Sequence, residues 1–143
     1  MNIAIGADHA GYELKKVIIG FLTEKGHQVE DFGCYSEESI DYPDYAHPVC
    51  DSIEKKSNKF GVLICGSGNG ISMAANKHSG IRAALSWKPE IAELGRLHNN
   101  ANIVSIPARF VSEEVALKIV EAFFSTEFEG GRHQTRVDKI SCR

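Results

Sequence analysis

The stretch FGVLICGSGNGISMAANK, residues 60–77, decides the fold class of this chain. It begins with an apolar run typical of a buried strand, passes through a turn containing Gly66, Gly68 and Gly70, and ends in a helical pattern. Open α/β sheets build anion sites in this way, because glycines let the backbone approach a ligand and the free N–H groups point at negative charge. Cys65 ends the strand in that field, where the N–H groups favour its thiolate form. The stretch therefore offers a base or nucleophile together with a cradle for an oxyanion.

Strand and helix patterns alternate along the rest of the chain. Five segments have strand patterns: residues 3–5, 28–32, 60–65, 81–85 and 102–106. Helical patterns lie between and after these strands. They cover residues 11–25 and 45–56, a short segment that ends at 77, a segment that begins at 88, and a last segment capped by Ser112. Five such units predict an α/β fold with a five-stranded parallel sheet, helices on both faces and the flavodoxin-like strand order 2-1-3-4-5.

Composition is that of one globular domain. The 143 residues are 43% hydrophobic, and we expect a single domain over 1–143 with a polar C-terminal tail from about 126 to 143. The net charge of −3, with acids and bases mixed, argues against nucleic acid or a membrane surface as a partner. No apolar stretch approaches the ~20 residues of a membrane span. Four scattered cysteines favour a reduced, cytoplasmic setting over a disulfide framework.

The turn after the first strand is expected to face Cys65, because ligands of such sheets gather beyond the carboxyl ends of the strands. That turn contains Asp8 and His9. Simpler roles are open for each: Asp8 as a helix N-cap, His9 as a solvent-facing residue, and Cys65 as a core thiol. The glycines around Cys65 contribute nothing to packing, and they favour the functional interpretation.

The Gly-rich turn does not match three better-known motifs. A dinucleotide fingerprint needs GxGxxG after the first strand, whereas GSGNG follows the third. A P-loop needs Lys and Ser or Thr directly after its glycines, but Lys77 lies two turns into the helix. A cysteine phosphatase needs an arginine six residues after its cysteine, where Ile71 stands. No His, Asp or Glu cluster has metal-ligand spacing, so we expect no metal and no cofactor.

Six segments resemble the type B ribose-5-phosphate isomerases, a family that includes the galactose-6-phosphate isomerase subunits: GADHAG at 6–11, DYPDYA at 41–46, CGSGNGISMAANK at 65–77, GIRAA at 80–84, RLHNNAN at 96–102 and EGGRHQTRV at 129–137. The resemblance covers nearly the whole chain, in order. It implies a Rossmann-like three-layer fold, a homodimer or dimer of dimers whose tails contribute to dimer and site, and no metal. It also implies interconversion of ribose 5-phosphate and ribulose 5-phosphate in the pentose phosphate pathway.

The resemblance implies a role for each motif residue in the chemistry. Cys65 matches the base that moves a proton between C2 and C1 of the sugar. The amides of Gly66, Ser67, Gly68, Asn69 and Gly70 are placed to bind the enediolate, and Ser67 also matches a residue that carries protons. His98 resembles the residue that opens the furanose ring, with Asp8 assisting. Some relatives have a glutamate base where this chain has Ile71, so this chain falls in the thiol-based branch.

The remaining matches concern substrate binding. The phosphate-binding set corresponds to His9, Arg109, Arg132 and Arg136, whereas Asn99 and Tyr42 hold hydroxyls or line the cleft. Without the resemblance, Arg132 and Arg136 read as one solvated helix face, because i, i+4 basic pairs are common. Which subunit supplies the three arginines is left open by the sequence.

The sequence has two alternative functional interpretations. The first is a non-catalytic nucleotide-binding module on the same topology, which needs a Gly-rich loop after the fourth strand. This chain has Ser-Trp-Lys-Pro at 86–89 and no glycine there, which favours the enzyme. The second is an allose- or galactose-6-phosphate isomerase, which shares the same machinery and differs only in cleft length.

Topology adds one more expectation, that the active site is shared between two subunits. Cys65 ends a strand at the carboxyl edge of the sheet and His98 precedes a strand at the opposite edge, so a shared site needs a partner across a two-fold axis.

Overall fold

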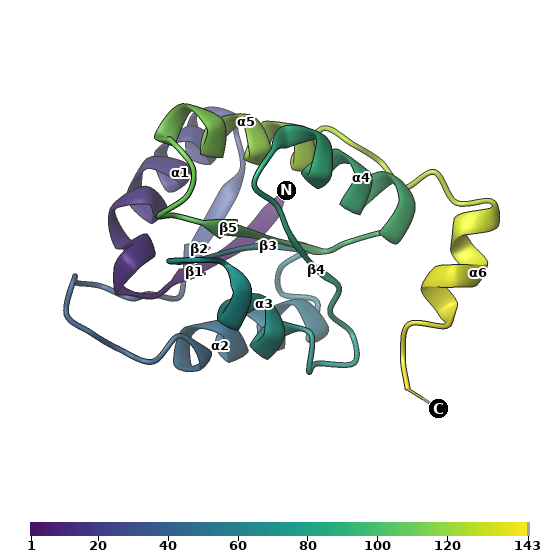
Figure 1. Ribbon diagram of the computed structural model, residues 1–143, viewed down its shortest axis with the longest axis horizontal. Coiled ribbons are helices and arrows are strands. Elements are labelled where there is room, and N and C mark those ends of the chain that lie inside the picture. The colour runs from purple at the N-terminus through teal and green to yellow at the C-terminus, as the bar shows by residue number, and fades with distance from the viewer. Residues whose placement is uncertain (143) are drawn as a thin grey trace.

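A five-stranded parallel sheet forms the middle of three layers in the computed structural model, which describes residues 1–142 (Figure 1). The strands are β1 Asn2–Ala7, β2 Gln28–Asp31, β3 Phe60–Cys65, β4 Ala83–Leu85 and β5 Ile103–Pro107. Their spatial order is β2-β1-β3-β5-β4. The α/β class and the parallel sheet are confirmed, but the predicted order 2-1-3-4-5 is wrong at its last two positions.

The strand order has a physical reason and a consequence for function. All five residues of β5 are buried, whereas the three residues of β4 are each half-buried. An interior position of a parallel sheet is covered on both faces, so the longer apolar strand occupies it and the short one lies at the edge. Because β5 pairs with β3, the last residue of β5, Pro107, lies beside Cys65. The loop after β5, and not the loop after β4, therefore flanks the cysteine.

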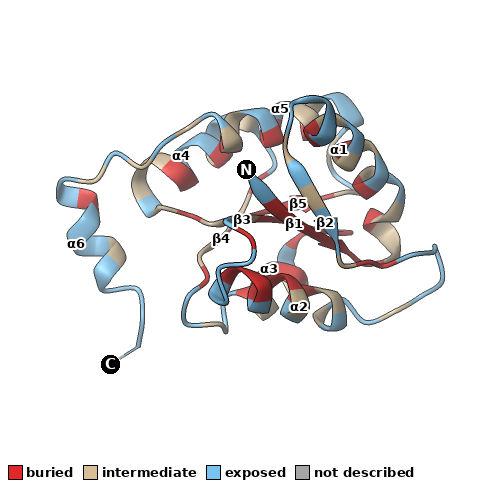
Figure 2. Ribbon diagram, turned by 180° about the vertical axis from the view of Figure 1, so that it is seen from behind, coloured by how far each residue is buried: buried red, intermediate tan, exposed pale blue. Residues whose placement is uncertain are grey.

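Helices cover both faces of the sheet. One face carries α1 Tyr12–Glu24, α4 Pro89–Asn99 and α5 Glu113–Phe124, and the other carries α2 Pro43–Glu54 and α3 Asn69–Ala75 (Figure 1). Alternate strand residues serve the two faces, since Ile3 and Ile5 belong to the first core and Ala4 to the second. Figure 2 shows the buried residues concentrated in the sheet and on the helix faces that meet it. No helix among residues 1–142 has the length and hydropathy needed to cross a bilayer.

The polar tail contains a further helix, α6 Arg132–Asp138, which packs on the C-terminal end of α4 and stands apart from the three layers (Figure 1). Of its seven residues only His133 is buried. The sequence pattern did not predict this helix as an element, because a short helix with one inward residue has no apolar stripe. A 3-10 turn, η1 His9–Gly11, connects β1 to α1.

An ion pair between a buried lysine and an exposed aspartate joins α1 to the end of β2. Lys15 is only 1% exposed, and its Nζ lies 2.7 Å from both carboxylate oxygens of Asp31. The Asp31 side chain is 34% exposed, so replacing Lys15 by alanine leaves no buried charge; it removes the packing of the buried lysine stem and two charge-assisted hydrogen bonds. We therefore expect Lys15→Ala to lower the free energy of unfolding by about 3 kcal/mol, measured by urea denaturation.

The neighbouring lysine provides the matched control. Lys16 pairs with Glu13 at 3.0 Å, but both side chains are more than half exposed. Exposed pairs contribute little, so Lys16→Ala should leave the free energy of unfolding almost unchanged. Equal losses in the two variants would show that the burial of Lys15 does not matter to stability.

Candidate active site

Cys65 ends β3 and is 4% exposed. The N–H of Gly68 donates to its Sγ at 3.1 Å, so an amide of the Gly-rich loop does face the thiol as the sequence suggested. Gly68 has a φ of +76°, and a Cβ there would lie 2.4 Å from Cδ1 of Leu85. A residue with a side chain cannot take this position without strain, which explains why the loop needs glycine.

The rest of the loop presents polar groups and one aromatic wall. Ser67 is exposed, and its Oγ accepts the N–H of Asn69 at 3.2 Å. The N–H of Gly70 lies in the first turn of α3, where helical N–H groups have no acceptor within the helix. Tyr42 packs over this turn, since a Cβ on Gly70 would lie 2.5 Å from Cζ of the ring. The loop therefore places amide donors, a hydroxyl and a phenol close together.

Asp8 lies in the turn after β1, next to the Cys65 strand. Its N–H donates to the carbonyl of Ile64 at 3.0 Å, which ties the two segments together. The carboxylate Oδ1 accepts the N–H groups of Ala10 and Gly11, at 2.9 and 3.2 Å. The N-cap role considered for Asp8 is thus correct, and both of these bonds use the same oxygen.

His9 is oriented by a hydrogen bond to its ring. The N–H of Ile40 donates to Nδ1 at 3.3 Å, so Nδ1 is an acceptor. The neutral ring then carries its proton on Nε2, which makes Nε2 a donor suited to an anionic ligand.

Arg109 joins the same group because of the position of β5. Its backbone N–H donates to the carbonyl of Gly66 at 3.0 Å, and the preceding N–H, of Ala108, donates to the carbonyl of Cys65 at 2.9 Å. The guanidinium lies over Gly66, where a Cβ would be 3.1 Å from Nη1. We call the assembled set the carboxyl-edge cluster: Asp8, His9, Tyr42, residues 65–70 and Arg109.

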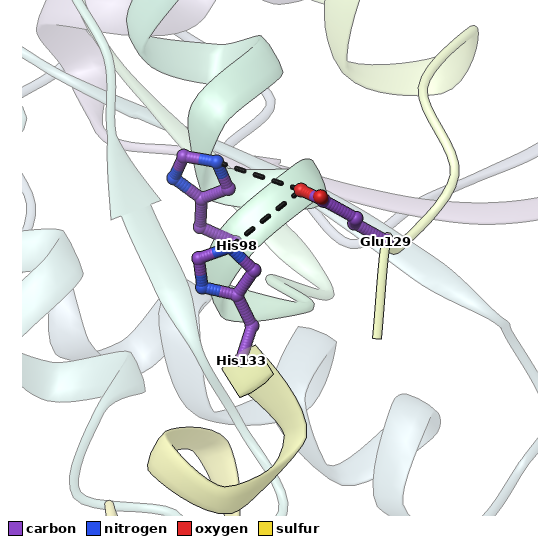
Figure 3. Close-up of side chains that lie close together, drawn as sticks. All are labelled: His98, Glu129 and His133. Carbon is purple, nitrogen blue, oxygen red and sulfur yellow. Dashed lines mark ion pairs between the residues drawn. The ribbon is translucent and has the colours of Figure 1, made fainter. Parts of the chain in front are cut away.

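His98 lies elsewhere, in the last turn of α4. Its imidazole stacks on that of His133 from α6, with the ring centroids 4.2 Å apart and the planes 15° from parallel (Figure 3). Oε2 of Glu129 lies 3.7 Å from Nε2 of His98 and 3.5 Å from Nε2 of His133. The tail is fixed here by its backbone, because the Glu129 N–H donates to the carbonyl of Leu97 at 3.0 Å.

Burial lowers the pKa of His133 from the ordinary histidine value, and a positive charge on His98 acts in the same direction. His133 is therefore uncharged at neutral pH, and His98 stacks on a neutral ring. Glu129 and His133 had no assigned role in the sequence, although both lie in the segment EGGRHQTRV. The only available signal was the density of polar residues in that segment.

Arg132 and Arg136 are exposed on α6, one turn apart, while His133 points inward. In the single chain they have the solvated-face arrangement that the sequence left open. We call the residues around this end of α4 the amino-edge cluster: His98, Asn99, Glu129, Arg132, His133 and Arg136.

The two clusters lie at opposite edges of the sheet. Cys65 pairs with Pro107 at the end of β5, whereas His98 precedes the first residue of β5, Ile103, by five positions. Five residues of strand span roughly 17 Å. Figure 1 shows the same separation, with α6 and the end of α4 at the opposite end of the sheet from the start of α3. The fold thus brings together Asp8, His9, Tyr42, the Cys65 loop and Arg109, and keeps His98, Asn99, Arg132 and Arg136 apart from them.

Folding also assembles two groups with metal-ligand geometry that sequence spacing did not reveal: His98, Glu129 and His133, and Asp51, Glu54 and His78. Each unites segments more than twenty residues apart, so no local motif marks them. The first belongs to the amino-edge cluster and the second lies outside both clusters.

A parallel α/β sheet that presents a thiol, amide donors and an arginine at one edge has the construction of an enzyme acting on an anionic small molecule. Residues 3–140 match the family model described as Ribose/Galactose Isomerase. The chain therefore belongs to the ribose/galactose isomerase family.

Individual relatives agree with this assignment. The ribose-5-phosphate isomerase B of Escherichia coli K12 is 45% identical over 141 residues, which cover 99% of this chain and 95% of the relative. The crystal structure of a ribose 5-phosphate isomerase from Thermotoga maritima is 53% identical, with a TM-score of 0.95 over 97% of this chain and 96% of that one. The Mycoplasma genitalium ribose-5-phosphate isomerase B, solved with bound ribulose 5-phosphate, is 48% identical, with a TM-score of 0.93 over 97% and 93%.

Proposed function

We propose that this protein is an aldose–ketose isomerase that interconverts ribose 5-phosphate and ribulose 5-phosphate, a step of the pentose phosphate pathway. The observation that carries the proposal is the position of Cys65. The N–H of Gly68 donates a hydrogen bond to the Cys65 thiol inside a Gly-rich loop. Relatives of nearly equal length include ribose-5-phosphate isomerases.

Cys65 acts as the base in the isomerisation step. Its thiolate removes the proton from C2 of the open-chain aldose and returns it to C1, which moves the carbonyl from C1 to C2. Negative charge collects on O1 of a cis-enediolate, where the amides of the loop and of the first turn of α3 donate to it. Ser67, exposed next to this loop, moves the proton between O1 and O2.

Ring opening precedes this step, because C2–H becomes acidic only next to a free carbonyl. We assign it to His98, assisted by Asp8. The stacked His133 ring and the nearby Glu129 carboxylate hold the His98 imidazole in place. Asp8 is fixed in orientation by its two N-cap hydrogen bonds.

The separation of the two clusters leads to a shared site in a homodimer, or in a dimer of dimers. One subunit supplies the carboxyl-edge cluster, including Arg109, and its partner supplies His98, Asn99, Arg132 and Arg136 across a two-fold axis. Exposed apolar side chains near the carboxyl-edge cluster support a partner there. Met73 of α3 is 66% exposed and Phe110, next to Arg109, is 75% exposed.

We further propose that residues 1–143 form one isomerase domain and that the protein works in the cytoplasm. The cysteines Cys34, Cys50, Cys65 and Cys142 are all free, as a reducing compartment requires.

Rates on three substrates test the activity directly. We expect kcat/KM to be highest for ribose 5-phosphate, compared side by side with allose 6-phosphate and galactose 6-phosphate. In deuterated water the C2 hydrogen should exchange with solvent, because the enediolate is formed through proton transfer. A higher kcat/KM for a six-carbon substrate would reassign the substrate, and no turnover of any of the three would reject the isomerase.

Arg132→Ala and Arg136→Ala should each lower kcat/KM by about 10- to 150-fold, because a charge-assisted hydrogen bond to phosphate contributes roughly 1.5–3 kcal/mol. The measurement is the initial rate at a substrate concentration far below KM. Lys139→Ala, another exposed cation that follows the same helix, serves as the control and should keep full activity. If the arginine variants match the control, both side chains form a solvated face and nothing more.

Activity should survive exhaustive chelation. The proposed reaction uses amides for the enediolate and arginines for the phosphate, so it leaves no role for a divalent cation. The rate is measured before and after dialysis against a chelator, with the metal content determined in both samples. A loss of activity that zinc or manganese restores, in a metal-free protein that is still fully folded at the assay temperature, would mean that a metal takes part in the reaction.

A further inference from the structure

Four side chains with metal-binding atoms meet on the outer side of α2, away from both clusters. His47, Asp51 and Glu54 follow one another at intervals of four and three residues, so they share one face of the helix. His78, in the turn between α3 and β4, reaches this face from a different segment and is only 16% exposed.

The distances suit a small divalent ion. Nδ1 of His78 lies 3.0 Å from Oε2 of Glu54 and 3.8 Å from Oδ1 of Asp51, and the three ligand atoms all lie within 4.8 Å of one another. Tetrahedral zinc with bonds of 2.0–2.2 Å places its ligand atoms roughly 3.4 Å apart. The three atoms can therefore reach the spacing that zinc requires after side-chain shifts of about an ångström or less.

The ligand orientations are fixed by a second set of contacts. Oε1 of Glu54 accepts the N–H of Gly80 at 2.8 Å, which leaves Oε2 facing His78. On the other side, Nε2 of His78 lies 2.8 Å from Nδ1 of His47. When that contact holds the ring proton on Nε2, the Nδ1 lone pair faces the two carboxylates, as in histidine ligands with an outer partner.

We propose that Asp51, Glu54 and His78 bind one divalent transition-metal ion, with His47 as the outer hydrogen-bond partner of His78. One imidazole with two carboxylates favours zinc over magnesium, because nitrogen ligands suit the later transition metals. The ion connects α2 to the segment between α3 and β4, and water completes its coordination. Since α3 directly follows the Cys65 loop, the site braces the scaffold of the carboxyl-edge cluster without contacting the substrate.

The test is a zinc titration by calorimetry on the full chain in the absence of substrate. A Cys142→Ser background removes an exposed thiol that would compete for zinc. We expect one saturable site per chain, with Tm raised by about 5–10 °C at free zinc near 100 times the dissociation constant. Magnesium at the same concentrations should leave Tm unchanged.

Variants locate the ion. Asp51→Asn and His78→Gln should each weaken binding at least tenfold, and His47→Phe by about 10- to 100-fold as loss of an outer partner. The Asp51→Asn variant should fold normally, because Asp51 is exposed and its contact with His78 is long. A loss of zinc binding in this variant therefore reports on the ligand and not on misfolding. His27→Gln, a histidine removed far from the cluster, and His133→Ala, which removes the other candidate group, should leave the affinity unchanged.

Three outcomes overturn the proposal: binding that does not saturate, affinity that is unchanged in Asp51→Asn and His78→Gln, or affinity that is lost in His133→Ala. Binding that does not saturate would mean that the cluster is only an ion-pair network between α2 and His78. Either of the other two outcomes would mean that the ion binds elsewhere. Because no substrate is present, these outcomes are independent of whether the protein is an isomerase.

Discussion

Cys65→Ala is expected to lower kcat/KM for ribose 5-phosphate by about 10²–10⁴-fold or more, the usual contribution of a positioned general base. The variant should still fold and bind sugar phosphate, because the thiol transfers a proton and does not hold the substrate. Exchange of the C2 hydrogen with deuterated water should disappear together with turnover. Both are measured on protein purified free of host isomerase.

Cys50→Ala is the matched control. Cys50 is also a buried thiol, on α2, and burial raises its pKa to about 12, so it remains protonated and inert at neutral pH. Its removal should leave kcat/KM unchanged per folded molecule. If Cys65→Ala kept the activity of Cys50→Ala, then Cys65 would be a core thiol and another group would be the base.

Local patterns predicted most of the elements. The strand over 60–65 has the predicted bounds, because its apolar run ends abruptly at the first glycine of the turn. Ser112 caps α5 as expected, and its Oγ accepts the N–H of Val115 at 3.1 Å. In both places the determining contacts lie within a few residues of one another in the sequence.

The order of β4 and β5 could not be predicted in this way. Consecutive strands usually lie side by side, and that tendency favoured β4 next to β3. The position beside β3 is buried on both faces of the sheet. The five buried residues of β5 suit that position, and the three half-buried residues of β4 do not. The helix α6 was missed for a related reason, since its position depends on contacts with α4 that are distant in sequence, such as the stacking of His133 on His98.

The candidate site was predictable only in part. Asp8 and His9 follow β1 and Cys65 ends β3, so their convergence is a property of parallel sheets. The approach of Arg109 to Gly66 depends on the position of β5, which the sequence interpretation had wrong. The contact of Glu129 with His98 and that of His47 with His78 bridge 31 residues each, and only the folded chain shows them.

The central claim is that each active site takes Cys65 from one subunit and His98 from its partner. Cys65→Ala and His98→Ala should each be inactive alone, since every site in either homodimer lacks one of the two residues. In a mixed dimer, one site receives both mutations and the other receives neither. Random exchange makes half of the dimers mixed, and each of these has one intact site, so roughly a quarter of wild-type activity should return.

The measurement is the isomerase rate of an equal mixture of Cys65→Ala and His98→Ala after subunit exchange. Exchange is verified with two differently tagged forms of the chain. A shared site predicts recovery to about a quarter of the wild-type rate, together with no recovery when either variant is exchanged with itself. If both residues act within one subunit, every site in the mixture keeps one defect. No recovery after verified exchange would therefore contradict the shared site.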